Sequence, residues 1–177
     1  MVTLKRDRFD SAYALVRQEP FSFLIASDIL AEAKRNALHQ DFPKYGEAGF
    51  LPYSDKECGP AVIDLVIEAT SPAVADSLGE QLGIERLSQY PTLVTICRFL
   101  DRRHGAIHTD GKAKIATALF YLNDSWGPTS GGCLRFLNGP DDVDDVVVPE
   151  LKPLYGNFAS VQITPSMAIY PLRVSVA

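Results

Sequence analysis

The sequence predicts an α+β fold, with helices in the first half of the chain and short strands in the second half. Apolar residues recur at helical spacing in 30–39, 62–69 and 73–82. Gly83 is a typical helix stop. After Pro91, short β-branched and apolar runs alternate with Gly, Pro and Asn. Many short strands preceded by helices indicate a jelly-roll or cupin-like barrel, with the N-terminal helices packed on one sheet.

Local signals place the elements of the first half. Residues 9–16 have apolar residues at helical spacing, which predicts a helix. The short aromatic and apolar run 21–25 fits a buried strand. A Ser-Asp pair can cap the helix over 30–39. The segment 43–60 is rich in Gly and Pro, and we expect it to be irregular.

The predicted strands of the second half share an apolar or β-branched composition and turn residues on either side. They cover 93–100, 115–122, 133–137, 143–148, 158–163 and 169–176. There is no internal repeat and no low-complexity linker in the sequence. We therefore expect a single domain over 1–177, in which 1–90 is mainly helical support and 91–177 is the barrel core.

Composition and charge exclude several classes of protein. The 177 residues carry 17 basic and 22 acidic side chains, and the net charge of −5 gives no electrostatic footprint for nucleic acid. No apolar run approaches the length of a membrane span, and the first residues show no secretory signal. The three cysteines are odd in number and far apart, which favours a reducing compartment. We expect a cytoplasmic protein that binds neither nucleic acid nor membrane; the sequence does not indicate its oligomeric state.

The pattern His108-Thr109-Asp110 is the first candidate for chemistry. Ferrous iron in oxygenases is commonly held by two histidines and one carboxylate, which leave positions for a co-substrate and oxygen. An H-x-D spacing supplies two of these ligands, because residues two apart on a strand point the same way. Alone, the pattern is common by chance. The alternative is a surface histidine beside a turn aspartate that precedes Gly111.

The residues that follow make this pattern more specific. The segment 108–136 reads HTDGKAKIATALFYLNDSWGPTSGGCLRF. Over about 92–158, the chain resembles the prolyl-hydroxylase-like branch of the Fe(II)- and 2-oxoglutarate-dependent dioxygenases. Members of that branch place H-x-D before a strand ending in Y-L-N, followed by a Trp and by G-G-x-L at the next strand. The matching residues here are His108, Asp110, Tyr121, Leu122, Asn123, Trp126, Gly131, Gly132 and Leu134.

The resemblance implies a double-stranded β-helix fold of about seven or eight strands in two facing sheets. It implies that His108 and Asp110 bind Fe(II), and that the Tyr121 hydroxyl forms a hydrogen bond with the carboxylate of the co-substrate 2-oxoglutarate. Ascorbate is a further candidate cofactor. If Tyr121 faces the pocket, strand alternation places Thr117 and Leu119 beside it. The alternative for Tyr121 is ordinary core packing.

Three other polar residues have simpler interpretations. His104 precedes the predicted ligand by four residues and is predicted to lie in a loop without a role at the site. Arg98 alternates with apolar neighbours, so it either meets an acidic substrate or extends its guanidinium group to water. His39 lies near a helix C-terminus, where the helix dipole favours a surface histidine.

The end of the chain departs from the family pattern. The family places a second histidine well after H-x-D, and then an arginine for the distal carboxylate of 2-oxoglutarate, but no histidine follows His108. Back-translation of 159–177, read from the third base of each codon, permits V-R-S-D-N-S-F-H-G-H-L-P-L-A-G-E-R-R. Met167 has a single codon, so with Ala168 it forces the glycine after the new histidine. We hypothesise that the tail from about Ser160 is a frameshifted translation of an ordinary oxygenase ending.

A displaced-frame ending was never selected to fit a barrel. We therefore expect 160–177 to pair poorly and the barrel core over 91–177 to be incomplete. Two protein ligands hold Fe(II) less firmly than three. Arg173 is the remaining candidate for the carboxylate anchor, although no pattern supports it.

The implied activity is hydroxylation of a C–H bond in an amino-acid, peptide or other small substrate, with 2-oxoglutarate converted to succinate and carbon dioxide. No residue is assigned as a catalytic acid, base or nucleophile. The first alternative is a non-catalytic binding module on a degenerate β-helix fold. The second alternative is a cupin-type, metal-dependent hydrolase or isomerase.

Overall fold

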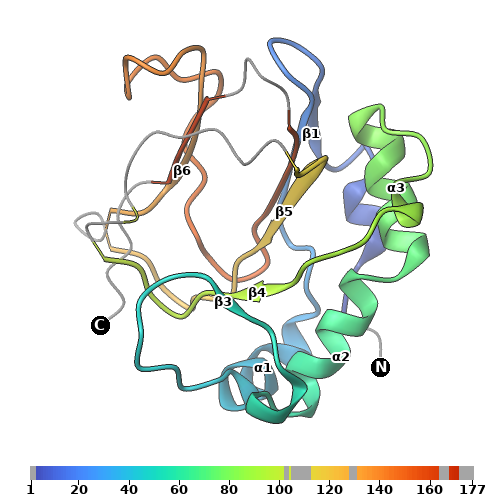
Figure 1. The fold of residues 1–177 in the computed structure, drawn as a ribbon, viewed down its shortest axis with the longest axis vertical. Helices are drawn as coiled ribbons and strands as arrows, with labels where there is room; N and C mark the ends of the chain where they lie inside the picture. Colours follow the sequence, from blue (N-terminus) through green and yellow to red (C-terminus); the bar gives the residue numbers. More distant parts are fainter. Residues whose placement is uncertain (1–2, 102–103, 105–112, 128–130, 164–167, 172–177) are drawn as a thin grey trace.

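A four-stranded antiparallel sheet forms the centre of the fold, with strand order β1-β2-β7-β5 (Figure 1). Its strands are β1 (Leu15–Arg17), β2 (Phe23–Ala26), β5 (Ala116–Phe120) and β7 (Phe158–Gln162). The structure is a computed structural model that describes residues 3–101, 104, 113–127, 131–163 and 168–171. Strand β7 lies inside the sheet, so residues from the two ends of the sequence share one ladder.

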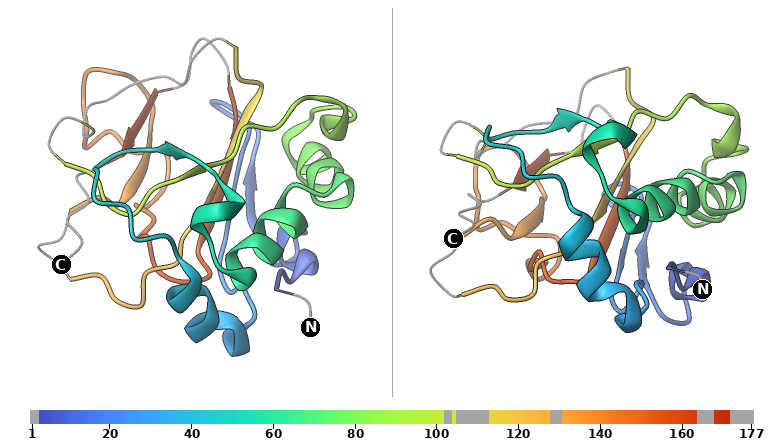
Figure 2. Two further views of the ribbon diagram at one scale, coloured as in Figure 1. Left: turned by 60° about the horizontal axis from the view of Figure 1, so that its bottom comes forward. Right: turned by 90° about the horizontal axis from the view of Figure 1, so that it is seen from below.

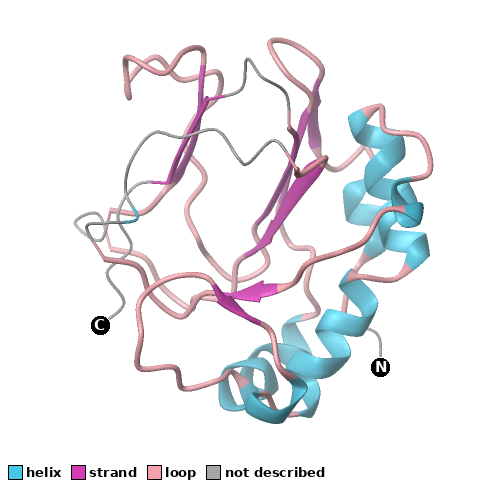
Figure 3. Ribbon diagram, viewed as in Figure 1, coloured by secondary structure: helices cyan, strands magenta, loops and turns pink. Residues whose placement is uncertain are grey.

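Two smaller antiparallel pairs complete the described strands (Figure 3). The first joins β3 (Leu51–Pro52) to β4 (Thr95–Ile96). The second joins β6 (Leu134–Leu137) to β8 (Ala168–Pro171). All the described ladders are therefore antiparallel, as short strands joined by turns and excursions allow.

The helices lie together on one side of the four-stranded sheet (Figure 2). They are α1 (Arg35–Asp41), α2 (Pro60–Ala69) and α3 (Pro72–Leu82), with 3₁₀ turns η1 (Arg6–Phe9), η2 (Glu32–Lys34), η3 (Asp55–Glu57) and η4 (Leu87–Gln89). The Ser71 side chain accepts a hydrogen bond from the Val74 amide and caps α3, and Gly83 ends that helix with a φ of 74°. Within the described part of the chain, none of the helices has the length and apolar composition needed to span a bilayer.

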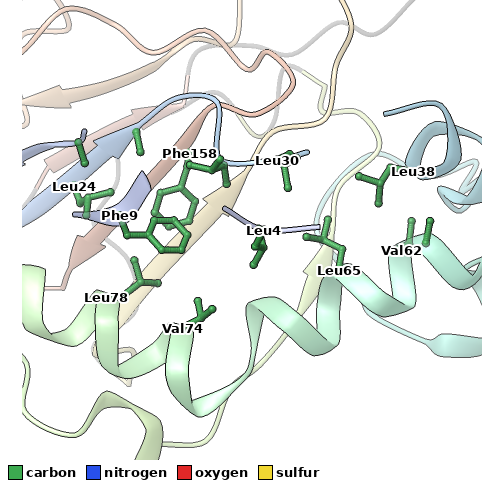
Figure 4. Close-up of a cluster of buried hydrophobic side chains, with 14 of the residues drawn as sticks. Leu4, Phe9, Leu24, Leu30, Leu38, Val62, Leu65, Val74, Leu78 and Phe158 are labelled. Atoms are coloured by element: carbon green, nitrogen blue, oxygen red, sulfur yellow. The ribbon is translucent and has the colours of Figure 1, made fainter. Parts of the chain in front are cut away.

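A helix-side core fills the space between the helices and the sheet (Figure 4). Phe158 of β7 is fully buried there, with its ring 4.9 Å from that of Phe9 and 4.8 Å from that of Phe120. In this view, Val74 and Leu78 of α3 lie beside Phe9, whereas Leu65 and Val62 of α2 lie beside Leu4 and Leu38. The main buried members are Leu4, Phe9, Leu24, Ile29, Leu30, Leu38, Val62, Leu65, Val74, Leu78, Leu82 and Phe158.

An inner core lies on the opposite face of the sheet, between the sheet and β6. Phe23 of β2 and Phe136 of β6 contact each other with ring centroids 4.6 Å apart. Its buried members are Phe21, Phe23, Leu134, Phe136, Val148, Ala159 and Val161. The sheet is thus covered by helices on one face and by a second strand pair on the other, and its strands alternate between two apolar layers.

The α+β class with helices on one face of an antiparallel sheet is confirmed. The predicted helix over 9–16 is wrong, because η1 ends at Phe9 and β1 begins at Leu15. The Asp10 carboxylate accepts a hydrogen bond from the Ala12 amide at 2.8 Å, a local turn that competes with a helix. The apolar residues of 9–16 therefore belong to two separate elements, η1 and β1, and not to one helix.

Two predicted strands are also shorter or missing. Of 93–100, only Thr95–Ile96 is a strand. In 143–148 there is no named strand, only an isolated bridge between Leu137 and Val146. The Asp144 amide donates to the Asp142 carboxylate at 2.8 Å. Aspartates that bind nearby main chain favour turns over ladders, and this accounts for the loss of the strand.

The described parts of the tail pair well, contrary to the expectation for 160–177. Residues 160–162 belong to β7 and pair with both β2 and β5. Ser160 is buried, and its hydroxyl donates to the Thr117 carbonyl at 3.1 Å. Residues 168–171 form β8 against β6. The expectation of poor pairing is wrong for these residues, and 164–167 and 172–177 lie outside the described residues.

Candidate functional site

The two predicted iron ligands, His108 and Asp110, lie outside the described residues. So do the predicted carboxylate anchor Arg173 and the turn residue Gly111. The described chain resumes at Ala113 and enters β5 three residues later. The metal site therefore stays a prediction, while its surroundings on β5 can be described.

Strand β5 alternates as the sequence predicts. Ala116 and Phe120 pack against the helix-side core, and so does Leu122 just beyond the strand. Leu119 packs against the inner core instead. By the same alternation, Tyr121 lies on the inner side, away from the helices.

Both the amide and the carbonyl group of Tyr121 form main-chain hydrogen bonds. Its amide donates to the Asn157 carbonyl at 3.1 Å, and its carbonyl accepts from the Gly156 amide at 3.1 Å. Gly156 has a φ of 79°, a conformation that favours glycine over other residues. The turn before β7 therefore holds Tyr121 at the end of β5.

The Tyr121 hydroxyl is desolvated, although the residue as a whole is only half-buried. Loss of solvent raises the pKa of Tyr121 well above its usual range, and the nearby thiols of Cys133 and Cys97 raise it further. Cys97 follows β4 and Cys133 precedes β6. The phenol therefore lies within electrostatic reach of these two thiols, and it stays protonated as a hydrogen-bond donor at neutral pH.

The two thiols beside Tyr121 are neutral as well. Burial raises the pKa of Cys97 to about 11 and that of Cys133 to about 11. Metal binding by cysteine needs the thiolate, so these neutral thiols are poor ligands. Sequence reasoning had used the cysteines only for the redox compartment, and it missed their position beside Tyr121. The position of Cys133 directly before a predicted strand was the one available signal.

The Y-L-N-D segment after β5 is bound by side chains from several elements. The Leu122 carbonyl contacts Nε2 of His39. The Asn123 side chain donates to the Pro153 carbonyl at 2.6 Å. The Asp124 carboxylate contacts Nδ1 of His39 at 3.0 Å and Nη1 of Arg35 at 3.0 Å. His39 is therefore not a free surface residue, contrary to the simpler interpretation of its sequence position.

The turn residues further along match their predicted role. The indole nitrogen of Trp126 donates to the Gly131 carbonyl at 2.6 Å. Gly131 and Gly132 have φ values of 64° and 72°, where glycine is favoured. These three residues therefore shape the approach to β6 and are packing residues.

His104 is oriented by a carboxylate. Its Nδ1 lies 2.9 Å from Oδ1 of Asp101. Its Nε2 would lie 3.1 Å from a Cβ atom added to Gly49, which has a φ of 124°. The ring therefore packs against the main chain of Gly49 and has a defined orientation. Arg98 is exposed and donates to the Tyr45 carbonyl at 3.0 Å, so it follows the interpretation as a solvent-facing residue.

Two open hollows lie on the surface of the described chain. The first, of about 380 Å³, is lined by residues of α1 and the following segment, including Asp41 and Tyr45. The second, of about 320 Å³, is lined by Arg135, Asp144 and Glu150 among others. Neither hollow includes Tyr121 in its lining.

Among the described residues, no group of three or more His, Cys, Asp or Glu side chains is arranged to hold a metal ion. No protein-family model matches the chain, and comparison with curated proteins finds no match. The case for a function therefore depends on the residues of the chain itself.

Proposed function

We propose that this chain derives from an Fe(II)- and 2-oxoglutarate-dependent dioxygenase that hydroxylates a C–H bond of an amino-acid, peptide or other small substrate. The observation that carries the proposal is the environment of Tyr121. Strand alternation places its side chain on the inner side with Leu119, where the resemblance expects a donor to the carboxylate of 2-oxoglutarate, and loss of solvent raises the pKa of its hydroxyl. The segment after it, matching Y-L-N, is held by hydrogen bonds from distant elements.

The arrangement of layers supports a double-stranded β-helix. The four-stranded sheet and the β6–β8 pair face each other across the inner core, and the helices cover the outer face of the larger sheet. In such a barrel, the ligand lies between the two sheets, with side chains from inward-facing positions. Strand alternation directs Tyr121 to this inner space, and Leu134, the residue after Cys133, is a buried member of the inner core.

Each residue has a defined part in the proposed chemistry. His108 and Asp110 would hold Fe(II), and their one imidazole and one carboxylate are two of the three donors such sites use. When bound, the iron and 2-oxoglutarate supply the oxidation by dioxygen, with succinate and carbon dioxide as co-products. Tyr121 binds and orients a carboxylate of the co-substrate through its hydroxyl. The apolar inner core beside it excludes water from that side.

The ending of the chain weakens this chemistry. No histidine follows His108, so the third protein donor of the family is missing from the sequence. The arginine that the family uses for the distal carboxylate is missing from the pattern as well. An unpaired carboxylate in a partly apolar site is unfavourable. We therefore expect weak iron binding and little turnover in the chain as it stands.

The decisive experiment compares two purified proteins. One is the 177-residue chain, and the other carries the displaced-frame reading from residue 160 together with the residues that follow it downstream. Both are supplied with Fe(II), 2-oxoglutarate, ascorbate and air, and succinate is quantified. We expect succinate from the restored protein, and its loss in a His108→Ala variant of that protein. Equal succinate formation by the two proteins would show that the tail hypothesis is wrong.

One alternative has a specific observation in its favour. The missing second histidine fits a non-catalytic binding module on the same fold. That function predicts binding of a small molecule without succinate formation, in the restored protein as well as in the present chain. A cupin-type hydrolase or isomerase predicts no response to 2-oxoglutarate in either protein. The succinate assay and a binding assay with 2-oxoglutarate therefore separate the three possibilities.

A further inference from the structure

We infer that His39 and Asp124 form a clamp that positions Tyr121 from outside the inner core. His39 lies on α1 and Asp124 follows β5, so the clamp joins the helix layer to the end of the site strand. That the clamp sets co-substrate affinity rests on the proposed function. The inference that the clamp fixes the main chain at Tyr121 does not depend on the proposed function.

The geometry of His39 provides two contacts from one ring. Its Nε2 meets the Leu122 carbonyl and its Nδ1 lies 3.0 Å from Oδ2 of Asp124. Carbonyl and carboxylate oxygens only accept hydrogen bonds, so the ring donates to one of them through a single N–H, and to both only when both ring nitrogens carry hydrogen. An aliphatic or aromatic side chain of similar size cannot make either contact. The imidazole ring therefore bridges a main-chain acceptor and a side-chain acceptor on one segment.

Neighbouring groups fix the other side of Asp124. Nη1 of Arg35 lies 3.0 Å from Oδ1 of Asp124, and the Arg35 guanidinium lies 4.0 Å from the centre of the Tyr155 ring. Glu32 binds Arg35 at 2.7 Å from the same helical turn. The His39 ring contacts Tyr155 edge-on, with ring centroids 6.1 Å apart. The carboxylate of Asp124 is thus shared by two basic side chains, and both pack on one aromatic ring.

The clamp acts on Tyr121 through the main chain. The Tyr121 carbonyl is bound by the Gly156 amide, and the next carbonyl, that of Leu122, is bound by His39. The Tyr155 amide donates to the Asn123 carbonyl at 2.7 Å, so three successive carbonyls are fixed. A tyrosine whose hydroxyl must meet a carboxylate within a few tenths of an ångström needs such support. Without His39, the Leu122 carbonyl loses its side-chain partner on α1.

The test uses three variants of the 177-residue chain. His39→Phe keeps a ring of similar size and removes both contacts. His39→Gln retains one N–H donor for the Leu122 carbonyl and serves as the conservative replacement. Asp41→Asn is the matched control, because Asp41 lies on the same helix but accepts from the Ala61 amide of α2 at 2.7 Å. It weakens this bond by removing the carboxylate charge, without touching the clamp.

Two readouts are measured in each variant. Amide hydrogen exchange reports local opening at Tyr121 and Tyr155, with the Gln162 amide of β7 as a reference inside the same sheet. Calorimetric titration with 2-oxoglutarate and Mn(II) reports co-substrate affinity, measured in the restored-frame protein that carries the same substitutions. In His39→Phe we expect exchange about tenfold faster at Tyr121 and Tyr155, and affinity about tenfold weaker. His39→Gln should recover part of both effects, and Asp41→Asn should show neither.

Each outcome decides a separate statement. Unchanged exchange at Tyr121 in His39→Phe would overturn the clamp, whatever the chain binds. Faster exchange with unchanged affinity would overturn its role in positioning the co-substrate. If the restored-frame protein without these substitutions binds no 2-oxoglutarate, the proposed function fails, and the exchange rates in the 177-residue chain alone confirm or overturn the clamp. Equal effects in Asp41→Asn and His39→Phe would also overturn it, since general loosening of α1 would then explain both.

Discussion

Replacement of Phe158 by alanine is expected to destabilise the protein more than any other single change in β7. The Phe158 side chain is fully buried and lies at the point where the helices meet the sheet. Its ring contacts those of Phe9 and Phe120, with centroids 4.9 and 4.8 Å away. Phe158→Ala therefore removes one large apolar side chain and two aromatic contacts at once.

The expected loss of unfolding free energy follows from these contacts. Truncation of a buried Phe to Ala typically costs about 3–5 kcal/mol, and the two ring pairs place this site at the upper end. Domains of this size are stable by about 5–15 kcal/mol, so the variant is expected to unfold at much lower urea concentration. The assay is urea denaturation followed by far-UV circular dichroism, with the midpoint and slope compared between variant and unmodified chain.

Two controls make the result interpretable. Phe158→Leu keeps most of the buried volume and should cost clearly less than Phe158→Ala. Ile67→Ala changes a side chain on α2 that is 63% exposed, so its effect should stay within about 0.5 kcal/mol. If Phe158→Ala cost less than about 1 kcal/mol, β7 would not pack under the helices as described, and the layer assignment would be refuted.

Three further predictions concern the helix layer and the inner side of β5. Gly79→Ala should lower the free energy of unfolding by about 1–3 kcal/mol in urea denaturation, because the added Cβ would lie 2.5 Å from the Ile84 carbonyl oxygen. The cost of this clash outweighs the gain of about 1 kcal/mol in helix propensity, and a stabilised variant would contradict the prediction. In the restored-frame protein, Tyr121→Phe should weaken 2-oxoglutarate binding about tenfold by calorimetry, through loss of one hydrogen bond to a carboxylate; unchanged affinity would remove Tyr121 from the site. Burial raises the pKa of both Cys97 and Cys133 from 9.0 to about 11. Between these two pH values the folded chain therefore binds more protons at its thiols than the unfolded chain does. The free energy of unfolding should fall as the pH rises through this window. A variant with both cysteines replaced by alanine should lose that part of the pH dependence, and an identical slope in the two proteins would be the contrary result.

Strand periodicity allowed much of the sheet to be predicted. The assignment of Phe120 and Leu119 to opposite faces is confirmed, because the period of two holds wherever both faces are buried. The predicted strand over 143–148 is wrong, since the Asp144 amide donates to the Asp142 carboxylate just before the run and the Asp144 carboxylate binds Arg135.

The candidate site was less predictable than the sheet. Tyr121 lies one residue beyond β5, which ends at Phe120, and only its inward side follows from strand alternation. His39 and Leu122, which contact each other, are 83 residues apart in sequence. No local pattern links a helix residue to a carbonyl on a distant strand. The proximity of Cys97 and Cys133 to Tyr121 has the same origin, because it depends on how β4, β5 and β6 come together.

The central position of β7 has a consequence for the order of folding. Phe23 pairs with Val161, so the ladder between β2 and β7 joins residues separated by 161 − 23 = 138 positions. During synthesis, the N-terminal helices leave the ribosome long before the strand that completes their apolar layer, and contacts of such long range form slowly. Once Gln162 is made, β7 is complete, and the helix-side core can close without the residues that follow. A change of reading frame from about Ser160 would therefore leave Phe158 and the helix-side core unchanged, and would alter the last three residues of β7 and the whole of β8.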